Sequence, residues 1–242
     1  MAMTRDISPD IGKIRLLLTQ PHNCSYLSDQ QATTAFVDPD APMDTQLYAQ
    51  LSTMGFRRSG PYLYSPFCKA CNACISARIP VNQFRANRSQ RRCLKRNADI
   101  SITPVDSISF EEHYPVYENY ISERHNGGDM YPPSRGQFEQ FLVNKWGCTK
   151  FLEFRLDGTL IGTAVVDQLP TALSAIYTYF LSQHSGRSLG TLAILFQIEL
   201  AKKLSLGYLY LGYWISDCQK MSYKAKYKPL EILQENTWQL SE

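Results

Sequence analysis

Cysteines are the residues whose spacing in this chain most directly suggests chemistry. Three of the seven, Cys68, Cys71 and Cys74, form a C-x2-C-x2-C pattern. Overlapping C-x2-C pairs can converge their thiolates on a zinc ion or an iron–sulfur cluster, with a fourth ligand from Cys24 or Cys93. The alternative is a set of reduced thiols packed as small hydrophobic side chains. The odd number of cysteines argues against a framework of disulfides.

Cations concentrate in residues 57–96, which contain ten Lys or Arg and no Asp or Glu. All 22 acids and the other 15 Lys and Arg lie elsewhere, so the net charge of +3 combines a +10 segment with a −7 remainder. A segment without acids suits contact with a polyanion, and the alternative is a solvated basic face. A second basic run alternates lysines with tyrosines over residues 220–228. This alternation suits phosphate contacts with base stacking, and equally an exposed strand.

The overall composition is that of a globular protein of 242 residues, 44% hydrophobic and 19% charged. This length allows one large domain or two small ones. No apolar stretch approaches the ~18 residues of a membrane-spanning helix. The apolar run over residues 14–19, which Arg15 interrupts, is shorter than the ~7–15 residue core of a secretory signal. We therefore predict a cytoplasmic protein that does not span a membrane.

The predicted secondary structure that positions these side chains is sparse before residue 104 and regular after it. Before it, residues 44–55 are predicted to form one helix, with Asp44 as the N-cap and Gly55 at the left-handed C′ position. Later predicted elements are helices over 110–124, 134–143 and 190–205, and strands over 149–156, 159–169, 172–182 and 208–213. The Asp157-Gly158 pair predicts a hairpin between the first two strands. We therefore predict two domains, an N-terminal cysteine-containing basic domain (1–103) and a mixed α/β domain (104–242).

The stretch SGRSLGTL, residues 185–192, leads from the third of these strands into the long helix. Backbone N–H groups at such a helix start can hold a phosphate or an oxyanion, and a plain turn is the alternative. The order of helices, antiparallel strands, loop, helix and strand is similar to that of the N-acetyltransferase superfamily. This resemblance implies an α/β (α+β) domain with a mixed, mostly antiparallel sheet. Because the loop holds coenzyme A in that group, a coenzyme A-dependent N-acetyltransferase is one alternative function.

Four longer strings carry a more specific resemblance. They are NCSYLSDQQATTAFVDP, GFRRSGPYLYSPFCKACNACISARIPV, YISERHNGGDM and LGYWISDCQKMSYKAKYKPLE. Together they resemble the bacterial aspartate/glutamate leucyltransferase family, whose relatives are the eukaryotic arginyl-tRNA–protein transferases. The resemblance implies transfer of leucine from leucyl-tRNA to proteins with N-terminal Asp or Glu, which creates a degradation signal. Transfer of arginine is the close alternative, and a non-catalytic RNA-binding metal module is a more distant one.

The same resemblance bears on the cysteines. In the arginyl relatives, a C-x-x-C pair and a later Cys-Cys pair hold a cluster. Here each pair retains one cysteine, Cys24 in the first and Cys71 in the second. The resemblance therefore implies a metal-free domain that requires no cofactor, with Cys24 near Cys71. Cys68 and Cys74 are the residues that could restore a zinc or iron–sulfur site.

Transfer from an aminoacyl-tRNA makes few catalytic demands, because the ester is already activated. The attacking α-amine has an ordinary pKa of ~7.7–8.0, so an appreciable fraction is neutral at cellular pH. Positioning of the two substrates and stabilisation of the tetrahedral oxyanion are the larger tasks. No Ser-His-Asp signature is needed. The candidates for accepting the amine proton or donating to the oxyanion are Asp167, Asp217 and Tyr179.

The charges of the two substrates suggest the binding residues. The carboxylate of the acceptor residue suits an arginine, which binds carboxylates bidentately. The candidates are Arg78, Arg124 and Arg57. The acceptor end of the tRNA suits cations beside aromatic rings, and its candidates are Arg85, Arg88, Arg91, Arg92, Lys95, Arg96, Lys220, Lys224 and Lys226. The alternative for each is a surface or structural cation.

Overall fold

The structure is a computed structural model that describes residues 14–128, 130–142 and 146–241. Residues 1–13 of the segment inspected for a secretory signal, and the predicted helix end at residue 143, lie outside the described residues. No helix of the described chain has the length and apolar character needed to cross a membrane.

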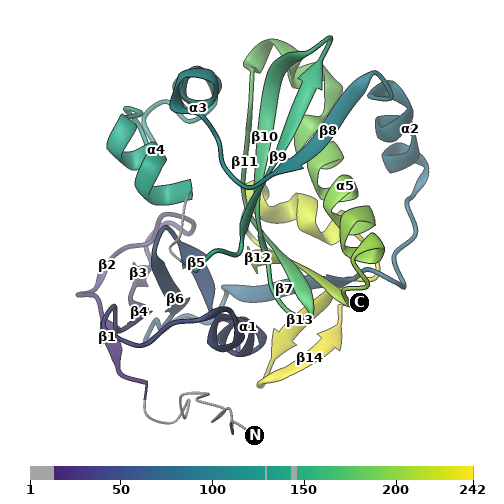
Figure 1. The fold of residues 1–242 in the computed structure, drawn as a ribbon. Coiled ribbons are helices and arrows are strands. Elements are labelled where there is room, and N and C mark those ends of the chain that lie inside the picture. Colours follow the sequence, from purple (N-terminus) through teal and green to yellow (C-terminus); the bar gives the residue numbers. More distant parts are fainter. Residues whose placement is uncertain (1–13, 129, 143–145, 242) are drawn as a thin grey trace, which may run out of the picture.

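An eight-stranded sheet forms the centre of the molecule (Figure 1). All neighbouring strands are antiparallel except β11 and β12, which confirms the predicted mixed, mostly antiparallel sheet. In spatial order the strands are β14 (Thr237–Leu240), β13 (Glu231–Gln234), β7 (Ile75–Pro80), β12 (Tyr208–Trp214), β11 (Ala172–Phe180), β10 (Thr159–Gln168), β9 (Thr149–Leu156) and β8 (Ile100–Val105).

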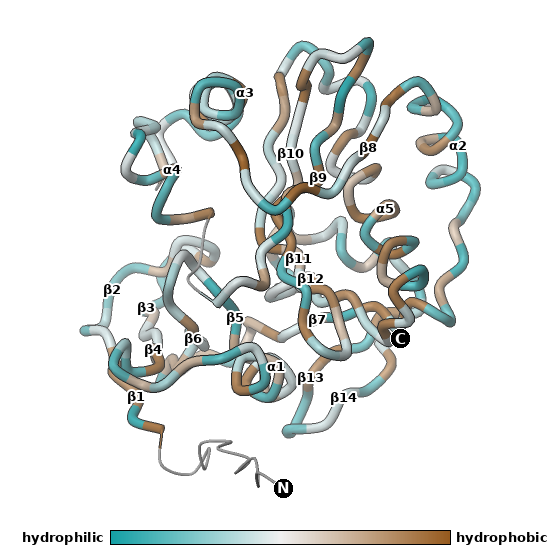
Figure 2. The backbone as a smooth tube through the Cα atoms, in the orientation of Figure 1, coloured by the Kyte–Doolittle hydropathy of each residue, from teal (hydrophilic) through white to brown (hydrophobic). Residues whose placement is uncertain are grey.

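Helices cover both faces of this sheet. The helices α3 (Phe110–Arg124) and α4 (Arg135–Leu142) pack on one face, and α5 (Leu189–Lys203) packs on the other. Neighbouring residues of β10 face opposite sides, so Leu160 and Val165 join the cluster under α3, whereas Ile161 and Val166 join the cluster under α5. A β-bulge between Leu160 and Gly162 shifts the alternation by one residue, which is why residues five apart share a face. Figure 2 shows apolar residues concentrated in the central strands and α5.

A smaller four-stranded sheet forms the N-terminal unit. Its strands are, in spatial order, β1 (Leu16–Leu18), β4 (Thr34–Val37), β6 (Tyr62–Pro66) and β5 (Arg57–Ser59), with a separate hairpin of β2 (His22–Asn23) and β3 (Gln31–Ala32). The predicted helix is α1 (Thr45–Thr53), whose N-cap Asp44 accepts a hydrogen bond from the Leu47 N–H at 2.7 Å. Gly55 follows it with φ +97°, as the C′ prediction required.

The predicted division after residue 103 does not coincide with a boundary between the sheets. β7 and β8 precede or straddle that residue, yet both belong to the large sheet. The helix α2 (Arg88–Arg96) joins them and packs on α5. The sequence pattern did not predict α2, because five of its nine residues are basic and few apolar positions mark a period. The unit with its own sheet therefore ends before β7.

The strands β11 and β12 run parallel and then separate. They pair only at residues 172–174 and 208–210, in strands that are described throughout. β11 continues along β10 to Phe180, and β12 continues along β7 to Trp214. Because the pairing ends early, the two strands diverge towards their C-terminal ends. The order α3, α4, β9, β10, β11, α5, β12 agrees with the order predicted from the sequence. The divergence of β11 and β12 opens space at the centre of the sheet.

Candidate active site

A cavity of about 650 Å³ lies where β11 and β12 diverge, and we call it the β11–β12 cavity. Residues of β5, α3, β11, β12, the start of α5 and the 3-10 helix η3 (Gln219–Lys226) line it. The lining is rich in cations and phenols: Arg57, Arg58, Arg124 and Lys224, with Tyr26, Tyr64, Tyr120, Tyr177, Tyr213, Tyr223 and Tyr227. None of the described lining residues is Asp or Glu. The cavity therefore suits an anionic ligand.

Arg57 is a buried cation of this cavity that has no partner anion among the described residues. It is 5% exposed, and its guanidinium lies over the Tyr210 ring at 4.6 Å. Nη1 donates to the Phe56 carbonyl at 3.3 Å, whereas Nε and Nη2 have no hydrogen-bond partner in the described chain. Burial lowers the pKa of Arg57. A buried guanidinium with two unpartnered donors is costly by itself, and the edge formed by Nε and Nη2 is arranged to receive a carboxylate.

Arg58, the next residue, has its anion inside the protein. Its Nε donates to Asp167 at 2.5 Å and its Nη2 at 3.1 Å, and both side chains are fully buried. Asp167 also accepts from Tyr48 at 2.9 Å and from Thr149 at 2.7 Å. These bonds tie β5 and α1 to β10. Asp167, predicted from the sequence as a catalytic candidate, does not line the β11–β12 cavity.

The other two predicted catalytic residues also lie away from the cavity. Asp217 is exposed and accepts a hydrogen bond from the Ser216 hydroxyl at 3.2 Å. Tyr179 is fully buried among Tyr117 and Phe138, beneath α3 and α4, where burial raises its pKa. Neither residue lines the β11–β12 cavity. Both residues have the side-chain chemistry that was sought, but the fold places Asp217 at the surface and Tyr179 in the core under α3.

Arg78, one of the three arginines predicted to bind the acceptor carboxylate, is already occupied. Its Nε donates to Glu231 at 2.6 Å across the β7–β13 pair. The guanidinium also lies over Tyr208 at 3.7 Å and Trp238 at 4.2 Å. The structure thus places Arg57 and Arg124 at the cavity and leaves Arg78 outside it.

Lys224 is the one member of the predicted tRNA-binding set that is buried. It is 6% exposed, and its Nζ donates to the Tyr213 carbonyl. Burial, and then the nearby Arg57, lower the pKa of Lys224 to about 7. The structure thus places Lys224 in the lining of the β11–β12 cavity and not on the surface with the other predicted cations. The other eight predicted cations are exposed.

The end of the basic helix α2 contacts the segment that leads into α5 and lines the cavity. Arg96 donates to the Gly186 carbonyl at 2.7 Å, and Asn97 donates to the Arg187 carbonyl at 2.9 Å. These carbonyls belong to η2 (Ser182–Arg187), which leads into α5, and Ser185 and Ser188 line the cavity. The end of the basic helix α2 is therefore hydrogen-bonded to the segment that lines the cavity.

Gln197 is a cavity residue that the sequence reasoning missed. It lies in the middle of α5 with 1% exposure, and its Oε1 has no hydrogen-bond partner in the described chain. The sequence did contain a signal for it. Gln197 is three residues after Ile194 and four before Ala201, so a polar amide lies on the apolar face of a predicted helix. Its free acceptor complements the free donors of Arg57.

The four cysteines considered as metal ligands line a second cavity of about 860 Å³, which we call the cysteine cavity. A tetrahedral zinc site would bring its sulfurs within ~4 Å of one another. No three of these thiols meet even a 4.8 Å limit among the described residues. Burial and the neighbouring thiols raise the pKa of Cys74 to about 11, which disfavours the thiolate. As arranged, Cys24, Cys68, Cys71 and Cys74 do not fit a metal or cluster site.

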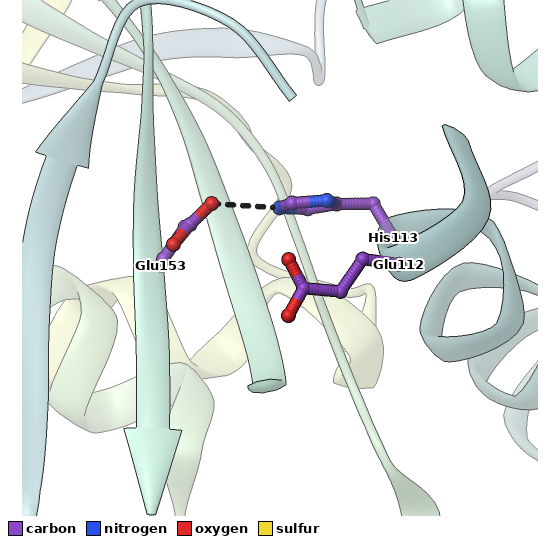
Figure 3. Close-up of side chains that lie close together, drawn as sticks. All are labelled: Glu112, His113 and Glu153. Atoms are coloured by element: carbon purple, nitrogen blue, oxygen red, sulfur yellow. Dashed lines mark ion pairs between the residues drawn. The ribbon is translucent and has the colours of Figure 1, made fainter. Parts of the chain in front are cut away.

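Among the described residues, three other potential metal ligands lie close together, namely Glu112, His113 and Glu153 (Figure 3). Their ligand atoms are within 4.8 Å of one another. Arg155 forms ion pairs with both carboxylates of this group. It binds Glu112 at 2.6 and 2.8 Å and Glu153 at 2.8 Å. His113 Nε2 lies 3.2 Å from Glu153, and its Nδ1 lies 3.0 Å from the Ser109 carbonyl. An arginine supplies the positive charge, so the group joins α3 to β9 rather than holding a cation.

His113 gives a stability prediction. Burial lowers the pKa of His113 below the usual 6.5, although Glu153 opposes this shift. The unfolded chain therefore binds the proton first, and the free energy of unfolding falls as pH decreases below about 6.5. Urea unfolding of the parent protein between pH 8 and 5.5 should show this loss, and His113→Gln should reduce it. The exposed His22→Gln is the matched control, and equal pH slopes for the parent and His113→Gln would contradict the assignment.

The order of elements and the cavity between diverging parallel strands define the class of protein, an acyltransferase-type fold like that of N-acetyltransferases. The solved structure of FemX is similar to this chain with a TM-score of 0.50 and 9% identity, over 90% of this chain and 86% of FemX. Such a likeness concerns the fold alone.

The family follows from sequence comparison. The C-terminal part of the arginine-tRNA-protein transferase family matches residues 112–234, and its N-terminal part matches residues 22–92. An aspartate/glutamate leucyltransferase from Pseudomonas fluorescens (strain Pf0-1) is 53% identical over 95% of this chain and 97% of that relative. One from Stutzerimonas stutzeri (strain A1501) is 54% identical over 94% and 97%. The chain belongs to the arginine-tRNA-protein transferase family, which confirms the resemblance seen in the sequence.

Proposed function

We propose that this protein transfers leucine from leucyl-tRNA to the α-amine of proteins that begin with Asp or Glu, and that the β11–β12 cavity is the site of transfer. The observation that carries this proposal is the charge of the cavity. A buried, unpartnered guanidinium lies in it, and no described Asp or Glu lines it. The names of the relatives support the same reaction. The product, a protein with N-terminal leucine, serves as a degradation signal.

The acceptor side chain binds Arg57 in this proposal. The Nε and Nη2 donors of Arg57 form the edge that pairs with both oxygens of a carboxylate. Arg124, exposed at the end of α3 and lining the same cavity, adds a second cation at the rim. A lysine or alanine at the acceptor N-terminus leaves Arg57 without an anion, so the cavity selects acidic residues.

The donor side chain meets an apolar part of the lining, formed by Leu189, Ile194 and Leu211, which belong to one core cluster. A leucyl group needs no charged partner there. An arginyl group would bring a third cation beside Arg57 and Lys224 with no described carboxylate to receive it. The charge of the cavity therefore favours leucine over arginine as the donor amino acid.

Attack of the acceptor amine on the ester forms a tetrahedral oxyanion, and its stabilisation is the main task of such a site. The Tyr177 hydroxyl is buried, lines the cavity and has no hydrogen-bond partner in the described chain. Burial raises the pKa of Tyr177, so the hydroxyl keeps its proton. It is our candidate donor to the oxyanion. The reaction as proposed requires no cofactor, since the ester is already activated, and proceeds in the cytoplasm, where charged tRNA is made.

The tRNA reaches the cavity along α2. Arg88, Arg92 and Lys95 are exposed and spaced to share one face of the helix. Neutralising all three with Gln is expected to weaken tRNA binding and to reduce the slope of log K against log salt by about 1 per lost phosphate contact. Fluorescence titrations at several salt concentrations measure this slope. Arg135→Gln on α4, across the sheet, is the matched control, and an unchanged slope in the triple variant would remove α2 from the tRNA path.

A donor and acceptor matrix tests the function itself. Leucyl-tRNA and arginyl-tRNA, each labelled in the amino acid, are offered separately with peptides that begin Asp, Glu, Lys or Ala. We expect label from leucyl-tRNA on the Asp and Glu peptides. Transfer to the Lys peptide would overturn the acidic-acceptor assignment, and efficient transfer from arginyl-tRNA would overturn the donor assignment. Turnover of acetyl-coenzyme A without transfer from either tRNA would favour the acetyltransferase alternative.

A further inference from the structure

Lys224 stands out among the buried groups that the proposed function leaves unused. It is 6% exposed, lines the β11–β12 cavity and donates from Nζ to the Tyr213 carbonyl. Lysines are almost never buried without a paired acid. No ion pair joins Lys224 to an acid within the described chain, and no described acid lines the cavity. The charged form of Lys224 is therefore poorly stabilised at this position, because it is buried and no described acid compensates its charge.

The groups around Lys224 also affect its charge. Arg57 approaches it from β5 and opposes its charge, whereas Cys218, just before η3, acts in the other direction. The Tyr223 ring lies 5.8 Å from Nζ. The Tyr213 hydroxyl points away, since it donates to the Gly55 and Tyr64 carbonyls. With burial and Arg57 together, the pKa of Lys224 is about 7, so ammonium and amine coexist at neutral pH.

Leucyl transfer creates a need for such a group. The attacking amine must lose a proton as the N–C bond forms, and the terminal ribose oxygen must gain one as the C–O bond breaks. Ribose alkoxide is a far stronger base than the amine, so an unassisted intermediate expels the amine. A catalytic group works best when its pKa lies near the working pH. The phenols Tyr177 and Tyr223 keep their protons, and no described carboxylate lines the cavity. The imidazole of His125 also lines it, but burial and the nearby cations Arg124 and Lys220 lower the pKa of His125 below its usual value, so it is a weaker base than Lys224 at neutral pH.

We propose that Lys224 is a catalytic residue that carries the proton from the attacking amine to the departing ribose oxygen. The neutral Nζ takes the proton from the acceptor nitrogen, and the resulting ammonium gives a proton to the ribose oxygen as it leaves. The products are an amide and a free hydroxyl, and the lysine returns to its neutral form. This inference rests on the function proposed above.

Single-turnover rates of leucyl transfer test it, measured with saturating leucyl-tRNA and Asp peptide between pH 5.5 and 9. Lys224→Met is expected to lower the rate about 10²- to 10⁴-fold, with little change in peptide KM or tRNA Kd. Lys224→Arg keeps the charge but cannot exchange the proton at this pH, so it is expected to be as slow. Added ethylamine should partly restore Lys224→Ala, with a dependence on pH. Lys203→Met, at the exposed end of α5, is the matched control.

Three results would overturn the inference. Lys224→Met could match the parent rate, Lys224→Arg could retain the parent rate, or the loss could appear only in tRNA Kd. Thermal unfolding of each variant separates a catalytic loss from a folding loss, and amine rescue of Lys224→Ala is a readout that a structural role does not give. Absence of leucyl transfer by the parent protein would count against the proposed function instead.

Discussion

Replacing Arg57 with Gln is expected to lower kcat/KM for a peptide that begins with Asp by about 30-fold or more. Removing one partner of a buried, hydrogen-bonded charge pair costs about 2–5 kcal/mol, and about 1.4 kcal/mol corresponds to each factor of ten. Arg57 gives this large effect because its Nε and Nη2 have no other partner in the described chain. Initial rates against peptide concentration, with leucyl-tRNA held constant, measure it.

The same substitution should have the opposite effect on stability. In the free protein, Arg57 is 5% exposed and has no partner anion, so its removal takes away a buried, uncompensated charge. The midpoint of urea unfolding should rise while activity falls. Arg57→Lys is the matched variant, because it keeps the charge but loses the planar fork that binds both carboxylate oxygens. An unchanged peptide KM in Arg57→Gln would contradict the acceptor site.

The second large effect is expected at Asp167, in stability rather than chemistry. Asp167→Ala leaves the Arg58 guanidinium buried without its carboxylate, and also removes the acceptor for Tyr48 and Thr149. Breaking such a buried pair from one side destabilises a protein by about 3–5 kcal/mol. Urea unfolding measures the loss. The folded fraction should retain a transfer rate within a few-fold of the parent, because Asp167 does not line the cavity.

The double variant Arg58→Met/Asp167→Leu is the control for this prediction. It removes both charges and keeps most of the side-chain volume, so it should recover part of the stability lost in Asp167→Ala. A variant at Asp167 that unfolds like the parent but transfers leucine slowly would instead support the catalytic role first predicted from the sequence.

Local signals in the sequence predicted the elements well. Asp157 and Gly158 both adopt positive φ, as their hairpin turn requires, and β9 and β10 pair across them. The helix predicted over 110–124 is α3. These features depend on residues close in the chain. The membership of β7 and β8 in the large sheet depends on partners far along the chain, which no local pattern records.

The same limit applied to the site. Three arginines with the same chemistry were predicted to receive the acceptor carboxylate. Of these, Arg78 is paired with Glu231, which lies 153 residues later. Arg58, which was not among the three, is paired with Asp167, 109 residues later, whereas the adjacent Arg57 lines the cavity. Which cations remain unpaired is decided by these distant contacts, so the sequence identified the type of residue but not the individual. Lys224 shows the same limit for lysines. It belongs to the basic run over residues 220–228, and nothing in that run indicates that this lysine is buried.

The central claim is that the leucyl donor and the acidic acceptor meet between β11 and β12. A crystal structure with 3′-leucylamido-3′-deoxyadenosine, a stable analogue of the charged tRNA end, and a peptide that begins with Asp tests it most directly. We expect the leucyl group in the β11–β12 cavity and the acceptor carboxylate within hydrogen-bond distance of Arg57. Both ligands bound elsewhere, for example in the cysteine cavity, with the β11–β12 cavity empty, would contradict the claim.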